Sequence, residues 1–287
     1  MEGIETLAAK CWAIREENFS PTIFLSYPAQ TTAVSVTGGD CALDCAHCGG
    51  VYLKRMKPLT AVTGRGEGLG PSCLISGGCT AGGNVPLAAH ASRLAALKPG
   101  RRFNLHTGLM DDADIDVIAP LADVVSFDFV GADETIREVF GLERTVADYA
   151  ACYKKLRARC RVAPHVCIGL HGGKIRGEYR ALALLRMLGA DSLTLIVFTP
   201  TRGTRYADCK PPVIEEALAV MAAARQLFPE VPISLGCMRP GGRYRDTLDQ
   251  AAVRLGLNAI VNPTPAAVRL AESLGLAAVG RGECCVL

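Results

Sequence analysis

The chain has 287 residues, of which 49% are hydrophobic and 21% are charged, and its net charge at pH 7 is +3. Its basic residues are scattered, which excludes the concentrated basic face of a typical nucleic-acid-binding protein. The apolar runs are too short for the ~18–20 residues that a membrane span needs. Residues 1–5 carry acids and no apolar stretch, so we expect a cytoplasmic protein without a signal peptide.

The predicted elements follow one another in a regular pattern. Short runs rich in β-branched residues alternate with helical patterns, which is typical of βα units and a parallel sheet. A helix is expected at residues 5–17 and a short extended piece at 22–25. The strands expected after these cover residues 32–37, 72–76, 102–106, 124–129, 162–170, 192–198, 232–235 and 259–261. The helices expected between them cover residues 87–97, 113–121, 146–158, 178–188, 213–227, 244–255 and 264–274.

This pattern predicts a single α/β domain, a TIM-type (β/α)8 barrel. An open, doubly wound sheet is the alternative, because periodicity cannot show whether a sheet closes. We divide the chain into an N-terminal extension with a short helix (residues 1–30), the barrel (31–276) and a cysteine-bearing C-terminal tail (277–287).

Thirteen cysteines are the unusual feature of the composition. In an exported protein so many thiols would indicate disulfide bonds, but we find no export signal, and a chain of this size does not need such cross-links. The cysteines are then either metal ligands or small buried hydrophobic residues. We expect both kinds in this chain.

Three of the cysteines form a compact motif directly after the first predicted barrel strand. Cys41, Cys45 and Cys48 have the spacing C-x3-C-x2-C and follow a pair of glycines. Three thiolates in such a loop can hold three irons of a [4Fe–4S] cluster and leave the fourth iron open to a substrate or cofactor. The loop also falls at the end of a strand where barrel enzymes place their chemistry. A zinc site with His47 as the fourth ligand is the alternative.

The motif resembles the hallmark of the radical S-adenosylmethionine (SAM) superfamily, C-x3-C-x-φ-C, with His47 at the position φ. The resemblance implies that SAM binds the open iron. An electron from the cluster then cleaves SAM to methionine and a 5′-deoxyadenosyl radical, which abstracts hydrogen from a substrate. His47 would pack near the adenine.

The second barrel strand ends in Ser76-Gly77-Gly78-Cys79, which looks like the Gly-Gly-Glu segment that meets the SAM amino group in this superfamily. Cys79 stands where glutamate is usual. His106, Thr107 and Asp128, at the ends of the next two strands, are placed to meet polar groups of SAM, or else satisfy loop backbone.

The cysteines outside the motif differ in what they suggest. Cys73 and Cys79 lie at opposite ends of one strand, about 20 Å apart, and cannot share a site. Cys152 and Cys160 suit packing on a helix. The adjacent Cys284 and Cys285 have little packing reason near the C-terminus. We expect an auxiliary iron–sulfur cluster that draws its ligands from Cys11, Cys79, Cys237, Cys284 and Cys285. Cys167 is a rival ligand, and the absence of a second cluster is the alternative.

Over most of its length the chain looks like the biotin synthase-related branch. It is similar above all to one component of the two-protein lipoyl synthase of archaea and some anaerobes. The likeness rests on residues 34–38, 75–79 and 82–87. It implies sulfur insertion at C6 or C8 of a protein-bound octanoyl chain, with the auxiliary cluster as sulfur donor. The implied partners are a second radical SAM subunit, a lipoyl carrier protein or peptide, and an electron donor such as ferredoxin or flavodoxin.

Other functions stay open at this stage. Within the class, a radical methyltransferase or an isomerase would not require the second cluster. Outside it, the alternative is an iron–sulfur or metal-binding protein without SAM chemistry. Among weaker signals, Arg239 suits either a substrate carboxylate or an ion pair within the barrel, and residues 200–204 resemble a loop of the biotin synthase branch.

Overall fold

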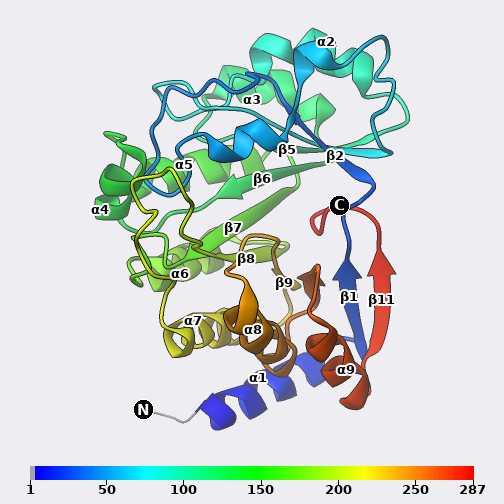
Figure 1. Ribbon diagram of the computed structural model, residues 1–287, viewed down its shortest axis with the longest axis vertical. Helices are drawn as coiled ribbons and strands as arrows, with labels where there is room; N and C mark the ends of the chain where they lie inside the picture. The colour runs from blue at the N-terminus through cyan, green and yellow to red at the C-terminus, as the bar shows by residue number, and fades with distance from the viewer. Residues whose placement is uncertain (1–3) are drawn as a thin grey trace.

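The computed structural model describes residues 4–287 as one sheet of eleven strands with helices around it (Figure 1). All pairings between these strands are parallel. The strands are β1 (Thr22–Ser26), β2 (Thr31–Ser35), β3 (Lys57–Pro58), β4 (Ser72–Ser76), β5 (Arg102–His106), β6 (Val124–Asp128), β7 (Val162–Ile168), β8 (Leu193–Val197), β9 (Ile233–Leu235), β10 (Ala259–Val261) and β11 (Ala277–Arg281). The parallel α/β class is therefore confirmed. All eight predicted barrel strands are present, as β2 and β4 to β10.

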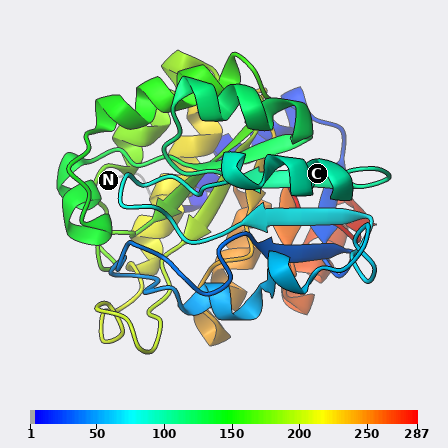
Figure 2. The same cartoon turned by 90° about the horizontal axis from the view of Figure 1, so that it is seen from above.

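The helices lie outside the curled sheet when it is seen from above (Figure 2). They are α1 (Ile4–Asn18), α2 (Ala91–Leu97), α3 (Asp112–Ile118), α4 (Asp133–Thr135), α5 (Val146–Arg157), α6 (Glu178–Leu188), α7 (Ile214–Leu227), α8 (Gly242–Arg254) and α9 (Pro265–Ser273). Shorter turns are η1 (Val51–Arg55), η2 (Leu59–Ala61), η3 (Ala88–His90), η4 (Ala119–Leu121) and η5 (Ile136–Phe140). Among residues 4–287, no helix combines the length and the apolar character needed to cross a membrane.

The sheet is a half-barrel and not the predicted closed barrel of eight strands. The strands run in the order β11-β1-β10-β9-β8-β7-β6-β5-β4-β2-β3, so β10 pairs with β1 and not with β2, and β1 and β2 are not paired either. The segment after β11 crosses this gap instead, since Gln30 N donates to Gly282 O and Cys284 N donates to Thr31 Oγ1, each at 2.9 Å. The C-terminal end accordingly lies between β2 and the β1/β11 edge (Figure 1).

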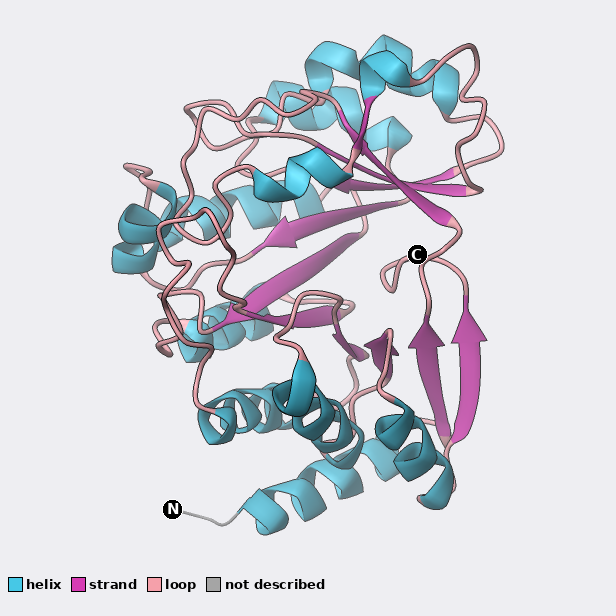
Figure 3. Ribbon diagram, viewed as in Figure 1, coloured by secondary structure: helices cyan, strands magenta, loops and turns pink. Residues whose placement is uncertain are grey.

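Both ends of the described chain contribute strands to the sheet. β1 lies in the expected N-terminal extension and β11 in the expected C-terminal tail, and the two lie side by side at one edge (Figure 3). Periodicity missed β11 because its side chains are exposed and show no buried face. The boundaries at residues 30 and 276 stay predictions.

The two faces of the sheet differ in character. In β5 the side chains of Phe103 and Leu105 are fully buried under the outer helices, whereas the alternate residues Asn104 and His106 face the inside of the half-barrel. Ser126 of β6 faces inward too and donates to Asn104 Oδ1 at 2.8 Å. The outer face therefore supplies the hydrophobic core, and the inner face carries polar groups.

A buried ion pair ties the segment after β9 to α8. Arg239 Nε and Nη2 donate to the carboxylate of Asp249 at 2.7 and 2.9 Å, and both side chains are inaccessible to solvent. Arg239 also donates to the carbonyls of Gly236 and Val261. Of the two interpretations of Arg239, the ion pair within the barrel is confirmed.

We predict that Asp249→Asn lowers the free energy of unfolding by about 3–5 kcal/mol, because it leaves the buried Arg239 charge without its partner. Urea unfolding of the metal-free protein measures the change. Asp246→Asn, one turn earlier on α8 and partly exposed, should change stability by no more than about 0.5 kcal/mol. Equal unfolding midpoints for Asp249→Asn and the unmodified protein would contradict the assignment.

Candidate functional site

The three motif cysteines lie in a loop that follows β2 at the carboxyl end of the sheet. A tight turn forms inside this loop, because Cys48 N and Gly49 N both donate to Cys45 O, at 3.0 and 2.9 Å. The turn keeps Cys45 and Cys48 close together. Cys41 lies at the start of the loop, beside the segment that follows β4.

Two distant segments hold the middle of this loop. Ala46 is fully buried; its N donates to Val139 O at 2.7 Å, and its O accepts from Tyr206 N at 2.9 Å. Arg205 reaches the same loop and donates to Asp44 O at 3.3 Å. Sequence reasoning missed these residues, because a backbone hydrogen bond places no demand on residue type. The only sequence signal close to Arg205 and Tyr206 is the segment 200–204, which resembles a loop of the biotin synthase branch.

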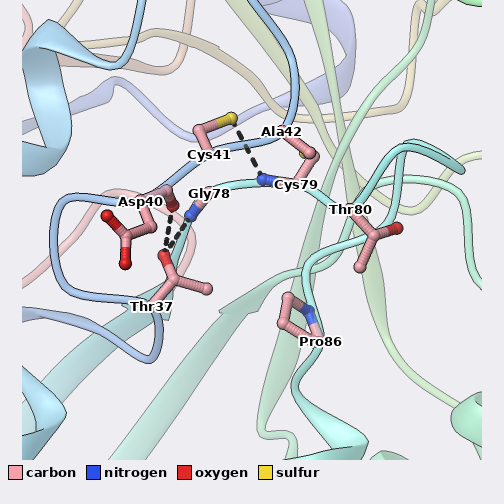
Figure 4. Close-up of a pocket in the computed structure, with 8 residues that line it drawn as sticks. All are labelled: Thr37, Asp40, Cys41, Ala42, Gly78, Cys79, Thr80 and Pro86. Carbon is pink, nitrogen blue, oxygen red and sulfur yellow. Dashed lines mark hydrogen bonds between the residues drawn. The ribbon is translucent and has the colours of Figure 1, made fainter.

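The loop after β4 meets the first loop through very close backbone contacts (Figure 4). Gly78 N donates to Thr37 Oγ1 at 2.7 Å, Cys79 N donates to Cys41 Sγ at 3.3 Å, and Ala42 N donates to Cys79 O at 2.8 Å. A Cβ at Gly78 would overlap the Asp40 carbonyl and lie 2.6 Å from Cys41 Cα, so only glycine fits there. A pocket of about 320 Å³ opens beside these two loops.

The thiols of this site raise one another's pKa. Burial, followed by the charges of Cys48, Cys79 and Cys41, raises the pKa of Cys45 to about 12. Burial and the charge of Cys41 also raise the pKa of Cys79 to about 12. The thiols therefore stay protonated unless a cation compensates their charge.

The donor set fits an iron–sulfur cluster. In such a cluster each thiolate binds its own iron, and N–H donors to sulfur stabilise the negative charge. Such donors are present: Cys41 accepts from a backbone amide, and amides of Gly50 and Tyr52 oppose the rise that burial causes in the pKa of Cys48. Within residues 4–287, no three Cys, His, Asp or Glu side chains converge as ligands of a single ion.

His47 belongs to the motif loop, and its ring faces an aromatic neighbour. Its ring meets Phe140 edge to face, with centroids 5.7 Å apart. Burial lowers the pKa of His47. Its Nδ1 is buried without a hydrogen-bond partner among the described residues, so a ligand with a polar edge would find a free group there.

A polar group faces the inside of the half-barrel below the first site. His106 Nε2 lies 3.1 Å from Asp128 Oδ2, and the ring of His165 lies 6.1 Å from that of His106. The side chains of Asp128 and His106 are 49% and 33% exposed, although their neighbours in the strands are buried. These two predicted cofactor-binding residues are therefore accessible from within the half-barrel, where a bound molecule would reach them. Thr107, by contrast, is fully buried.

Three of the expected auxiliary ligands come together inside the half-barrel. The charges of Cys237, Cys284 and Cys285 act on one another, and Asn104 Nδ2 donates to Cys284 Sγ at 3.6 Å. The hydrogen bond from Cys285 lowers the pKa of Cys284. Cys237 is exposed, whereas the other two are held by the tail that crosses the gap.

The structure does not bring the remaining candidates to this group. Cys11 is buried between α1 and α7, and its thiol lies 3.6 Å from Ala222 O, on the outside of the sheet. Cys79 belongs to the first site. Cys167, the rival ligand, lies on the inner face near Asp128 and Glu178, whose charges add to the effect of burial in raising its pKa.

Comparisons with known proteins are now informative. No protein-family model matches the chain. A biotin synthase of Syntrophotalea carbinolica is 29% identical over 221 residues, which cover 70% of this chain and 66% of that protein, slightly less than two thirds of its length. Two solved structures share the fold. Methylornithine synthase has a TM-score of 0.68 at 15% identity, covering 97% of this chain and 91% of its own. The [FeFe]-hydrogenase maturase HydG from Carboxydothermus hydrogenoformans has a TM-score of 0.68 at 14% identity, covering 96% and 72%.

The likeness to biotin synthase agrees with the expected resemblance to the biotin synthase-related branch of the radical SAM superfamily. It does not single out the lipoyl synthase component. The similarity to the solved structures concerns the fold, because their sequence identity is low.

We predict that Asp128→Asn lowers the pKa of His106. Burial alone would lower this pKa, but the charge and hydrogen bond of Asp128 outweigh it and raise the pKa above 6.5. The ion pair between His106 and Asp128 thus stabilises the fold at pH values below 6.5. Its contribution is lost as the pH rises through the raised pKa of His106. NMR titration of the imidazoles in metal-free protein measures the shift. Asp191→Asn, on the outer surface beside Arg157, is the control and should leave His106 unchanged.

Proposed function

We propose that this protein is a radical SAM enzyme of the biotin synthase-like type that inserts sulfur into a protein-bound octanoyl chain. The observation that carries the proposal is the gathering of Cys41, Cys45 and Cys48 in one partly buried loop at the carboxyl end of a parallel half-barrel. Three thiolates would hold a [4Fe–4S] cluster there and leave one iron for SAM.

The chemistry that such a cluster supplies when bound is one-electron cleavage of SAM to methionine and a 5′-deoxyadenosyl radical that abstracts hydrogen. The chain's own residues would bind the cluster and orient SAM. Backbone amides donate to the sulfurs and favour their thiolate form. His47 offers its unpaired Nδ1, and Gly78, which follows Ser76 and Gly77 at the end of β4, lines the pocket beside the motif loop. His106 and Asp128 offer polar groups from the inner face.

We propose an auxiliary iron–sulfur cluster at Cys237, Cys284 and Cys285. Their position supports this, since a cluster there would face the same interior as the first site, and a substrate between the two would reach both. In this proposal the auxiliary cluster donates the sulfur. None of the thirteen cysteines, all of which lie within the described residues 4–287, is in a disulfide bond, so their thiols are available as iron ligands.

The proposed partners follow from the reaction. A second radical SAM subunit, an octanoylated carrier protein or peptide, and an electron donor such as ferredoxin or flavodoxin would complete the system. A second candidate function is another biotin synthase-like radical reaction, a methyl transfer or an isomerisation. The 29% identity to a biotin synthase supports the biotin synthase-like type without favouring one reaction of that type, so this candidate stands beside sulfur insertion.

The first prediction from this proposal concerns SAM cleavage. After anaerobic reconstitution with iron and sulfide, the reduced protein should convert SAM to 5′-deoxyadenosine, measured by chromatography. Alanine at Cys41, Cys45 or Cys48 should abolish the product, because two thiolates cannot retain the cluster. Cys160→Ala, a partly buried thiol at the end of α5, should retain full activity. Failure of the loaded, reduced protein to cleave SAM would reject the class.

The second prediction concerns iron content. We expect about eight irons per chain in the reconstituted protein and about four after Cys284→Ser with Cys285→Ser, since each cubane holds four. Iron analysis and EPR measure this, with Cys152→Ser, a buried packing cysteine, as control. About four irons in the unmodified protein would remove the auxiliary cluster and favour the second candidate function. Sulfur insertion itself is tested with an octanoylated carrier peptide, by mass spectrometry.

A further inference from the structure

A fourth thiol lies at the first site. Cys79 follows β4, and its backbone contacts the motif loop twice, through the amide that donates to Cys41 Sγ and the carbonyl that accepts from Ala42 N. Cys79 and Cys41 also line the same pocket (Figure 4). The two sulfur-bearing residues are therefore held at a fixed, short separation.

Cys79 lies close enough to the motif cysteines for the charges of their thiolates to interact. Its charge acts on Cys45 and is acted on by Cys41 and Cys48.

Packing alone does not account for this position. Cys73, in β4, is completely buried among apolar residues, as a packing cysteine should be. Cys79 is only partly buried, and its side chain borders an open pocket. Gly78 brings it there, because any larger residue would push the two loops apart.

We propose that the Cys79 thiolate binds the fourth iron of the cluster when SAM is absent, and that SAM displaces it. The inference rests on the proposed [4Fe–4S] cluster at Cys41, Cys45 and Cys48. In the exchange the Fe–S(Cys79) bond breaks with both electrons on sulfur, which takes a proton from solvent. The amino and carboxylate groups of SAM donate their electron pairs to the iron, and no oxidation state changes.

Competition between Cys79 and SAM for the fourth iron lowers the apparent affinity of the protein for SAM. A ligand that binds only the minor, competent state has its apparent affinity reduced by the population of that state. If Cys79 occupies the iron about nine-tenths of the time, its removal should tighten SAM binding about tenfold. The thiolate would in return protect the open iron from loss.

The experiment compares reconstituted full-length protein with Cys79→Ala and Cys79→Ser, and with Cys160→Ala as a matched partly buried thiol. Equilibrium dialysis with radiolabelled SAM gives the dissociation constant. We expect it to fall about tenfold in both Cys79 variants and to stay unchanged in Cys160→Ala. Serine nearly preserves the side-chain volume and so separates ligand loss from a packing defect.

A second readout needs no SAM. Mild oxidation should remove the fourth iron from the Cys79 variants and give the EPR signal of a [3Fe–4S] cluster, which the unmodified protein should resist. Equal SAM affinities and equal [3Fe–4S] yields would overturn the role of Cys79 and leave the proposed function standing. Loss of the whole first cluster from both variants would also overturn it, because Cys79 would then be a permanent ligand. A cluster that forms but never responds to SAM would reject the proposed function instead.

Discussion

The close approach of the loops after β2 and β4 is the constraint on which the first site depends. Parallel neighbouring strands deliver both loops to the same edge, and Gly78 lets the backbone of one rest on the other. The amide of Cys79 then reaches Cys41 Sγ. A thiol loop alone would be flexible, but this contact, with the bonds at Ala46, fixes where the sulfurs point.

Much of the fold could be read from the sequence, because alternation and helical periodicity are local signals. The eight barrel strands are examples, and the positions of His106 and Asp128 at strand ends followed from them. Closure could not be predicted in this way. Whether β10 pairs with β2, as closure of the eight predicted strands requires, depends on the tilt and stagger of the whole sheet, which no segment encodes by itself.

The parts of the candidate site whose residues lie close together in the sequence could be predicted, whereas the parts that join distant segments could be predicted only in part. The motif cysteines are seven positions apart at most, so spacing sufficed for them. The grouping of Cys237 with Cys284 and Cys285 joins two distant segments and was anticipated only in part. Cys11 was assigned to the tail because both lie near chain ends, yet α1 packs on the outside of the sheet and the tail turns inward. Residue type could not distinguish those two faces.

The crossing of the open edge by the last described segment has a consequence for biogenesis. Gln30 and Thr31 have no partner for that contact until Gly282 and Cys284 have left the ribosome. The polypeptide must therefore be synthesised as far as Cys284 before this contact can form, and such long-range contacts form late and slowly. Cys284 belongs to the crossing segment, so its thiol reaches the inner face only together with this late contact.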